Sequence, residues 1–425
     1  MPYLRRERTK MKYKDSGYEW IGIIPEQWKV EKLKYHLRRN EPRNPGNKMV
    51  LSLYRELGIV PKDSRDDNHN VTSEDTSNYK YVQIGDFVIN KMKAWQGSVA
   101  VSDYEGIVSP AYYVYNFIDD VFDRRYFHYL IRSCYKDEFM RLSGGIRAGQ
   151  WDLPSSALDS IPLLIPSKEE QKHIARELDI LCEKIEVLVE KAKETVTRYK
   201  QWKIAMVYEA VTKGLKADVP FIESDILHIG KVPAHWKLIP NKYIMKKKKE
   251  ICEKWKGEAV MSLTMNGVIV RDLENPSGKM PTTFDGYQYV NAGELLMCLF
   301  DIDVTPRCVG RVFQDGVTSP AYSSFVLSND ADLDYYYYYY LMLDNTKELL
   351  TYAKNLRHSL TEEQLGLLKV PLPPLEEQKE IAKYLDFKIG KIDGIIAEKE
   401  MLIAKLDEYK KAMIFEFVTG KKVVK

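Results

Sequence analysis

The residue types that most often carry catalysis or bind cofactors are present in this sequence, but not at the spacings that such chemistry needs. The Gly-Lys pairs that begin at Gly230, Gly278 and Gly420 lack the glycine spacing and the preceding strand of a phosphate-binding loop. No GxGxxG segment is present, and none of the seven histidines belongs to an HExxH arrangement that would hold zinc. The sequence therefore predicts no ATP, dinucleotide or metal site, and no enzymatic active site, in this chain.

Methyltransferase motifs and disulfide-type cysteine patterns are missing as well. The chain has neither the Asn-Pro-Pro-aromatic segment of adenine methyltransferases nor the prolyl-cysteine of cytosine methyltransferases. The number of cysteines is odd and no two form a CxxC pair, so we expect reduced and mostly buried thiols. The cysteines are Cys134, Cys182, Cys252, Cys298 and Cys308.

Composition predicts a folded chain with more than one domain. Its 425 residues are 44% apolar and 12% aromatic, and no apolar run approaches the roughly 20 residues of a membrane span. The N-terminal residues are basic but lack the apolar core of a secretory signal, so we expect a cytoplasmic protein without a membrane partner. The net charge of +3 argues against an indiscriminate polyanion binder, but it is compatible with a nucleic-acid reader that has localised basic surface.

An internal repeat organises the chain. The segment SPAY occupies residues 109–112 and again 319–322, and the pattern IGxxPxxWK begins at Ile21 and again at Ile229. The segment PSKEEQ at Pro166 corresponds to PPLEEQ further along the chain. Because the order of the matches is preserved at an offset near 210 residues, nearly the whole chain is two copies of one unit.

Each copy consists of a β-rich globular part followed by a long charged segment. Alternating apolar residues between Gly, Asp and Asn turns predict a mixed, twisted sheet with a few helices in each globular part. We therefore predict an α+β fold. Its segments are a first globular domain at 1–165, a long helix at 166–215, a second globular domain at 216–374 and a second long helix at 375–425.

The first charged segment is predicted to be one helix. Residues 167–213 contain no proline or glycine. Apolar residues recur there at spacings of four and three, which is typical of a coiled-coil seam. Ser167 and Glu170 form a capping-box pattern at its start, and a helix of this length would extend about 70 Å. The predicted seam residues are Ile174, Leu178, Leu181, Ile185, Leu188, Tyr199 and Trp202.

The second charged segment carries the same register. Lys388 and Lys399 occupy two seam positions. Gly390 and Gly394 lie one helical turn apart and indicate either a close helix–helix approach or local fraying. The predicted seam residues are Ile381, Leu385, Ile392, Ile395, Leu402, Leu406 and Tyr409.

Each long helix would expose an apolar seam to water if it stood alone. We therefore predict that the two helices pack on each other, and that they are antiparallel because the first runs from one globular part to the other and the second must run back. The expected result is a pseudo-two-fold arrangement in which an antiparallel coiled coil joins two globular domains and its length sets their spacing.

This combination of features resembles the DNA-specificity subunits of type I restriction–modification systems. The resemblance covers almost all of the chain and depends on the repeated IGxxPxxWK, SPAY and EEQ segments, together with INKMKAWQGSVAV from Ile89. It implies that the globular parts are target-recognition domains. Each would read one half of a bipartite, asymmetric double-stranded DNA target, and the coiled coil would be both spacer and dock.

The same resemblance implies partners and their cofactors. Two modification subunits, which bind S-adenosylmethionine and methylate adenine, would attach to the coiled coil, and restriction subunits would add cleavage that depends on ATP and Mg. This chain would then be a non-catalytic targeting subunit with no cofactor of its own, in agreement with the missing motifs.

The residues that would contact DNA are expected on loops and strand ends. Arginine and lysine suit guanine, and asparagine and glutamine suit adenine. Ser109 and Ser319 are expected to hold the SPAY turns instead, and Trp28 and Trp236 to anchor the packing. The predicted DNA-contacting residues are Lys91, Lys93, Gln96, Tyr112, Arg147 and Gln150 in the first domain, and Arg307, Arg311, Tyr322, Asn355, Arg357 and His358 in the second.

Several alternatives stay open at this point. The lysines at 246–249 form either a phosphate-contacting strip or a solubilising face, and Trp95 and Trp151 are either core or stacking residues. The rival functions are a coiled-coil scaffold that binds only proteins, an enzyme of unfamiliar design, and the specificity subunit of a related system that fuses methylation and cleavage in one partner.

Overall fold

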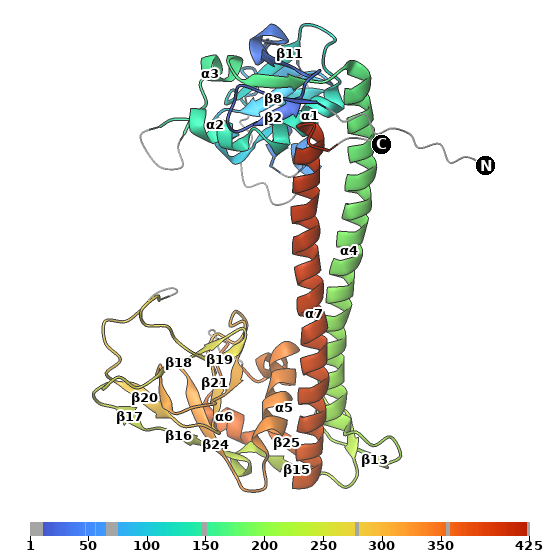
Figure 1. Cartoon of the computed structure of the whole chain (residues 1–425). Coiled ribbons are helices and arrows are strands. Elements are labelled where there is room, and N and C mark those ends of the chain that lie inside the picture. Colours follow the sequence, from blue (N-terminus) through green and yellow to red (C-terminus); the bar gives the residue numbers. More distant parts are fainter. Residues whose placement is uncertain are drawn as a thin grey trace, which may run out of the picture. The chain divides into compact units, whose positions relative to one another are not determined.

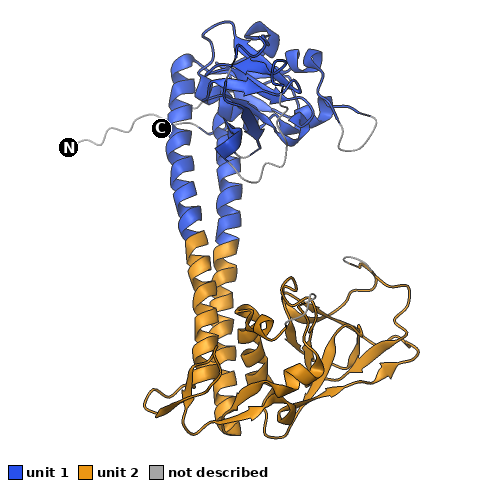
Figure 2. Cartoon of the chain, turned by 180° about the vertical axis from the view of Figure 1, so that it is seen from behind, with its two compact units in different colours: residues 1–192, 401–425 blue, residues 193–400 orange. Residues whose placement is uncertain are grey.

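The computed structural model of the chain divides into two compact units, each with a β-rich head and a part of each of two long helices (Figures 1 and 2). Unit 1 comprises residues 1–192 and 401–425, and unit 2 comprises residues 193–400. The residues that the structure describes are 12–46, 48–55, 57–64, 75–145, 151–276, 280–353 and 358–422.

The head of unit 1 is built on a four-stranded antiparallel sheet, accompanied by shorter strand pairs. The sheet has the order β4 (Leu37–Arg39), β11 (Tyr112–Phe117), β8 (Phe87–Asn90) and β9 (Val99–Val101). The shorter pairs are β5 (Leu51–Tyr54) with β6 (Gly58–Pro61), β7 (Lys80–Val82) with β10 (Gly106–Val108), β1 (Tyr13–Asp15) with β2 (Ile23–Pro25), and β3 (Lys29–Lys32) with β12 (Pro162–Ile165). A parallel bridge between Val50 and Ile107 links β5 to β10.

Three helices complete this head: α1 (Arg124–Ser133), α2 (Lys136–Leu142) and α3 (Ser155–Asp159). Helix α1 begins after Asp123, whose carboxylate accepts hydrogen bonds from the N–H groups of Arg125 and Tyr126. Its buried face includes Phe127, which belongs to the same core as Phe87 and Tyr115 of the sheet. The head therefore has one main core beneath the four-stranded sheet.

The head of unit 2 repeats this architecture, but its second sheet has five strands. One sheet has the order β16 (Met245–Lys248), β24 (Ser323–Leu327), β21 (Leu295–Met297) and β22 (Val309–Arg311). The other has the order β17 (Ile251–Cys252), β20 (Tyr287–Val290), β23 (Gly316–Thr318), β18 (Val260–Thr264) and β19 (Gly267–Val270), with β18 and β23 parallel. Two pairs remain, β13 (Phe221–Glu223) with β14 (Lys231–Pro233) and β15 (Lys237–Pro240) with β25 (Lys369–Leu372). The matching strand orders confirm the predicted repeat and the mixed sheets.

The run of six tyrosines lies on helix α5 (Leu333–Asn345), the counterpart of α1, and α6 (Glu362–Leu367) follows it. Tyrosine is tolerated in a core when its hydroxyl finds a partner. The hydroxyl of Tyr336 donates to the Pro371 carbonyl oxygen at 2.8 Å, and that of Tyr338 donates to Asp386 Oδ1 at 2.6 Å. The run therefore lies mostly in the core, and its hydroxyl groups bond to β25 and to the second long helix.

The two long helices, α4 (Lys168–Lys213) and α7 (Leu375–Val418), pack side by side (Figure 1). In unit 1, Lys410 Nζ lies 2.6 Å from Glu186 Oε1, and in unit 2, Lys203 Nζ lies 2.6 Å from Asp393 Oδ1. Residue numbers thus rise along one helix as they fall along the other, which confirms the predicted antiparallel coiled coil. The two ion pairs are also copies of each other, because an offset of 207 converts Lys203 into Lys410 and Glu186 into Asp393.

Six of the fourteen predicted seam positions are wrong by one residue. Leu178, Ile185, Leu385 and Ile392 are buried as predicted, and Tyr199 and Leu406 are half-buried. However, Val189 is 9% exposed whereas Leu188 is 53% exposed. Ile174 and Ile381 are also buried as predicted, with 2% and 0% of their surface exposed. The seam positions that replace predicted ones are Cys182 for Leu181, Val189 for Leu188, Lys203 for Trp202, Ile396 for Ile395, Ile403 for Leu402 and Lys410 for Tyr409. Of the replaced residues, Leu181 and Ile395 are half-buried.

The physical reason is that apolar residues often stand in adjacent pairs along these helices. Leu188 and Val189 form such a pair, and choosing either residue gives spacings that alternate between four and three. The pattern alone does not distinguish the two registers, and the packing of the partner helix decides between them.

Both interpretations of the two helical glycines are wrong. Gly390 and Gly394 are exposed, and a Cβ atom built on either would meet no described atom within 4 Å. Helix α7 also continues through both positions without a break. The glycines lie on the outer surface of the helix, away from the seam.

The glutamine of each EEQ segment joins a long helix to its head. Gln171 is fully buried, and its Nε2 donates to the carbonyl oxygens of Val121 and Pro166, both at 3.0 Å. Its Oε1 accepts from the Asp123 N–H at 2.8 Å, at the start of α1. In unit 2 Gln378 makes the same three bonds, to Asp330, Pro373 and Asp332.

Neighbouring residues strengthen this joint in unit 1. Trp28 is buried, as predicted for a packing anchor, and its indole N–H donates to Glu170 Oε1 at 3.1 Å. The predicted capping box is therefore only half formed, since the Ser167 hydroxyl accepts from the Glu170 N–H while the Glu170 carboxylate bonds to Trp28. A hydroxyl secures the other long helix, because Tyr126 donates to the Val418 carbonyl oxygen at the end of α7.

The two compact units divide both long helices, which were predicted to be separate segments of the chain. The boundary falls after Ala192 in α4 and before Met401 in α7. Each head therefore folds together with the adjoining part of both helices, although the predicted borders at 166 and 375 lie within two residues of the helix starts.

Substitutions at the adjacent pair in α4 test the seam. Val189→Ala should lower the free energy of unfolding by about 2 kcal/mol, because it removes buried methyl groups from the coiled coil. Leu188→Ala should change it by less than about 0.5 kcal/mol, because this side chain is largely in solvent. Urea unfolding of both variants measures the difference, and equal losses would contradict the observed register.

Removal of a joint glutamine should loosen a head. Gln171→Ala leaves two carbonyl groups and one N–H buried without partners, which should cost about 3 kcal/mol of the free energy of unfolding. Hydrogen exchange should then accelerate at the amides of residues 121–124. The exposed Gln201→Ala on the same helix is the control, and unchanged exchange in Gln171→Ala would exclude the joint.

Candidate nucleic-acid interface

Each SPAY segment forms a tight turn that leads into an inner strand of a four-stranded sheet. The Tyr112 N–H donates to the Ser109 carbonyl oxygen at 3.0 Å, and the Tyr322 N–H donates to that of Ser319 at 3.1 Å. Proline follows each serine, where its fixed φ favours the turn. Each serine hydroxyl also accepts a hydrogen bond from the alanine N–H two residues on. The predicted role of Ser109 and Ser319 is thus confirmed.

In unit 1 the SPAY turn and the loop after β8 lie at the same end of the sheet, which we name the turn end. Tyr112 pairs with Asn90, and Lys91, Lys93 and Gln96 follow Asn90 along the chain. Lys93 is exposed, whereas Lys91 Nζ lies 3.2 Å from Asp152 Oδ2. Four of the six predicted contact residues of this domain therefore gather at the turn end.

The aromatic rings at this end pack against different groups. Trp95 and Trp151 are half-buried against each other, with centroids 5.4 Å apart. Tyr112 packs against the cluster around Leu51, and its burial raises the pKa of its hydroxyl. Trp95, Trp151 and Tyr112 are thus all half-buried beside the turn.

In unit 2 a polar hollow of about 470 Å³ adjoins the SPAY turn. Ser319, Tyr322, Tyr287 and Arg271 contribute to its lining. The nearby Gln288 supports the turn, because its Nε2 donates to the carbonyl oxygens of Ser319 and Tyr322 at 3.1 and 2.6 Å. Sequence reasoning missed Arg271 and Gln288. Gln288 stands at the repeat position of Lys80, whose Nζ bonds to the Tyr112 carbonyl oxygen in unit 1 as Gln288 bonds to that of Tyr322.

Two of the three predicted arginines of unit 2, Arg307 and Arg311, are already engaged with protein groups. Arg311 Nη1 lies 2.5 Å from Asp334 Oδ1 and 3.6 Å from Asp386 Oδ1, and its guanidinium lies over the Tyr337 ring. Burial lowers the pKa of Arg311, but the two carboxylates more than offset this effect and raise the pKa overall. Arg307 is half-buried and donates to the Tyr337 hydroxyl at 3.4 Å.

The remaining predicted contact residues are placed unevenly. Arg147, Gln150, Asn355 and Arg357 lie outside the described residues. His358 is exposed and has a φ of 45°, in the left-handed region that few residues other than glycine adopt.

The two heads carry opposite charge in equivalent loops. The loop after β8 in unit 1 presents Lys91 and Lys93, whereas the loop after β21 in unit 2 presents the exposed Asp301 and Asp303. Lysine donates to guanine, and aspartate accepts from the cytosine amino group. The shared fold thus carries loops of different chemistry.

The lysine run is partly used within its own head. Lys247 pairs with Glu362 at 3.6 Å, and Lys248 pairs with Glu294 at 3.1 Å. Lys246 and Lys249 are exposed. The run is therefore neither a continuous phosphate strip nor wholly solvated.

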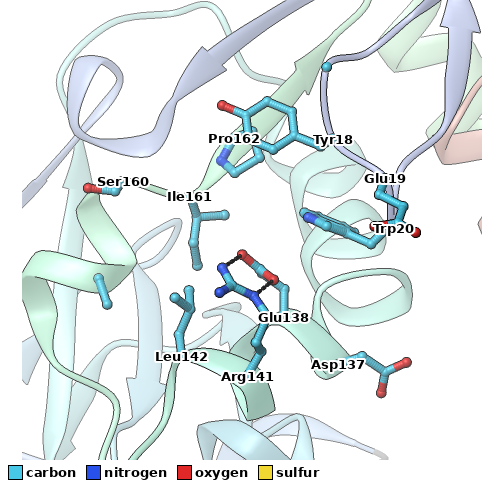
Figure 3. Close-up of a pocket in the computed structure, with 12 residues that line it drawn as sticks. Tyr18, Glu19, Trp20, Asp137, Glu138, Arg141, Leu142, Ser160, Ile161 and Pro162 are labelled. Carbon is cyan, nitrogen blue, oxygen red and sulfur yellow. Dashed lines mark hydrogen bonds and ion pairs between the residues drawn. The ribbon is translucent and has the colours of Figure 1, made fainter.

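A hollow of about 700 Å³ lies in the head of unit 1, away from the SPAY turn (Figure 3). Its lining includes Tyr18, Trp20 and Leu142, and the Glu138 carboxylate accepts two hydrogen bonds of 2.7 Å from Arg141. The acid is thus fully engaged by the arginine, and the lining residues include no histidine or cysteine. Nothing in this hollow forms a nucleophile–base pair.

Two further kinds of site are absent from the part of the chain that the structure describes. No group of three or more His, Cys, Asp or Glu side chains is placed to hold a metal ion. No helix among them is both long enough and apolar enough to cross a membrane.

Comparison with known proteins gives a consistent result. The family model described as type I restriction modification DNA specificity domain matches residues 28–198 and again 241–401, which together exceed half of the chain. The two matches fall on the two copies of the internal repeat.

Individual relatives match along almost the full length. The chain is 25% identical to the type I restriction enzyme MjaX specificity subunit of Methanocaldococcus jannaschii, over 97% of this chain and 98% of that protein. It resembles a chain from a structural study of complex assembly and conformational transition in a type I R-M system, with a TM-score of 0.70, 13% identity and coverage of 94% and 99%. It also resembles the HsdS subunit of Thermoanaerobacter tengcongensis, with a TM-score of 0.55, 14% identity and coverage of 96% and 100%.

Proposed function

The chain belongs to the family of type I restriction–modification DNA specificity subunits, and from that premise we propose that it reads a bipartite, asymmetric double-stranded DNA target with one half-site per head. The observation that carries this proposal is the opposite charge of equivalent loops on two copies of one fold. A symmetric pair of readers would favour a palindrome, whereas Lys93 and Asp303 would contact different base edges.

In this proposal the chain supplies targeting and its partners supply the chemistry. Two modification subunits would bind S-adenosylmethionine and methylate adenine, and restriction subunits would cleave DNA with ATP and Mg. The residues that surround both SPAY turns are donors and acceptors suited to bases and phosphates, and they do not form a catalytic pair.

The coiled coil offers a surface suited to docking the modification subunits. One of its flanks, which we name the docking flank, consists of Leu188 and Tyr409 in unit 1 and of Ile395 and Trp202 in unit 2. Trp202 is 53% exposed and Tyr409 is 54% exposed. With the offset of 207, Leu188 corresponds to Ile395 and Trp202 to Tyr409. Each unit thus presents the same two repeat positions, as two copies of one partner would require.

The opposite flank carries an ion pair in unit 2. Lys200 pairs with Glu400 at 3.3 Å, in addition to the two pairs within the seam. Exposed aromatic residues are enriched at protein interfaces, whereas Lys and Glu are depleted. The docking flank is therefore the better surface for a partner helix.

A map of methylated adenines tests the function. Lys93→Ala should relax recognition in one half of the target, and Arg307→Ala in the other half, because each residue belongs to a different head. Loss of a base contact costs about 1–3 kcal/mol of discrimination. Arg147→Ala and Arg357→Ala extend the same test to residues that the structure does not describe. The control is Lys216→Ala.

The outcome also separates the rival functions. If both variants blurred the same half-site, the assignment of one head to one half-site would be wrong. If omission of this chain left the methylation map unchanged, the chain would be a scaffold that does not read DNA. Methyl transfer or cleavage by this chain alone would indicate an enzyme.

Trp202→Ala tests the docking flank. Truncation of an exposed aromatic anchor costs about 2 kcal/mol or more, which is roughly a 30-fold weaker binding of one modification subunit. Native mass spectrometry of the complex should then show a species with one modification subunit. Ile204→Ala, an exposed apolar residue outside the flank, is the matched control, and the same loss in both variants would contradict the assignment.

A further inference from the structure

A second feature is retained on the surface of both copies, away from the coiled coil. Tyr35 at the end of η1 (Leu33–Tyr35) is 57% exposed, and Tyr243 at the end of η4 (Asn241–Tyr243) is 63% exposed. A lysine precedes each tyrosine and lies over its ring, with Nζ 5.4 Å from the ring centroid for Lys34 and 5.3 Å for Lys242. Because these side chains are exposed, core packing does not explain why both copies carry the same lysine–tyrosine pair.

Basic residues follow each tyrosine at the same distance along the chain. Arg38 on β4 corresponds to Lys246 on β16, and both are exposed. We name the sets Lys34, Tyr35 and Arg38 in unit 1, and Lys242, Tyr243 and Lys246 in unit 2, the cation–tyrosine patches. The cations of these patches form no ion pair among the described residues. The cation at the next position along the chain is paired in both units, Arg39 with Glu41 and Lys247 with Glu362.

In unit 2 the patch borders a concave surface. A hollow of about 330 Å³ is lined by Lys242, Lys246 and Lys247 and by the apolar residues Met245 and Phe325. Glu362 also lines it and pairs with Lys247, which leaves Lys242 and Lys246 as its cations without an ion pair among the described residues. A carboxylate on a short apolar stem fits this combination of cations and apolar wall. In unit 1, Arg38 lies on β4, which corresponds to β16 of unit 2, because β4 pairs with β11 as β16 pairs with β24.

The patches lie at the opposite end of the sheet from the SPAY turns. In unit 1, β11 begins with Tyr112 at the turn end and ends with Phe117, which pairs with Leu37 next to the patch. In unit 2, β24 begins just after Tyr322 and ends with Leu327, which pairs with Met245. A strand of this length separates the two ends by roughly 17 Å. The placement favours a protein partner over DNA held at the turn end.

We infer that the cation–tyrosine patches are two copies of a second docking surface for an acidic region of the modification subunit. This inference rests on the proposed function, which supplies a partner present twice. Two surfaces with a lysine, a tyrosine and a further cation at the same repeat positions fit two copies of one partner, and exposed tyrosine and arginine are favoured anchors of interfaces. Opposite charge across the contact would speed and orient assembly.

Charge reversal with removal of the ring tests the patches. The variants are Lys34→Glu, Tyr35→Ala and Arg38→Glu combined in unit 1, and Lys242→Glu, Tyr243→Ala and Lys246→Glu combined in unit 2. Each triple variant of the full chain should bind one of two cognate modification subunits at least about tenfold more weakly, and the combined variant should bind both more weakly. Native mass spectrometry and titration measure this, and the melting temperature shows that the chain still folds.

Two controls and a DNA measurement complete the experiment. Lys34→Arg, Tyr35→Phe and Arg38→Lys together keep charge and ring and should bind like the original chain, as should Lys14→Glu and Lys216→Glu at exposed positions outside the patches. Unchanged assembly of the triple variants overturns the inference. It is also overturned if assembly is normal but DNA affinity and its salt dependence fall, because the patches would then contact phosphates. If the unaltered chain binds no modification subunit, the proposed function itself fails.

Discussion

The need to bury one apolar stripe on each of two long helices governs this structure. Neither α4 nor α7 has enough polar surface on that stripe to stand alone in water, so each completes the other. Lysines within the seam, Lys203 and Lys410, are half-buried and reach acids on the facing helix. A polar residue in an otherwise apolar seam penalises shifted registers, and two such ion pairs related by the repeat hold both ends of the pairing in register.

The same constraint makes each unit depend on two distant parts of the chain. Unit 1 needs residues 401–425, and its core includes Met413 and Phe417 together with Ile174 of α4. The joints extend this dependence to the heads, because Gln171 and Gln378 bond the start of a long helix to the start of α1 and α5. The repeated segments of the sequence are thus the parts that pack and join, whereas the loops that differ are free to carry recognition.

Charge follows the same division between scaffold and loops. A net charge of +3 on 425 residues leaves little general attraction for a polyanion. The cations are used locally instead: some complete ion pairs such as Lys248 with Glu294, some lie at the turn ends, and some form the cation–tyrosine patches. In the proposed function, partner subunits would supply the remaining attraction for the duplex.

The sequence alone determined the repeat, the two-head organisation, the long helices and the family, because these depend on patterns that extend over hundreds of residues. It also identified the SPAY serines and Trp28 as structural. Tertiary structure decided what depends on single contacts. It placed Val189 rather than Leu188 in the seam, because an adjacent apolar pair satisfies both registers until a second helix packs on it. It engaged Arg311 with Asp334 and Asp386, which lie far from it along the chain. It also gave the EEQ glutamines their role, because a buried amide is recognised only when its three partners, brought from separate segments, are in place.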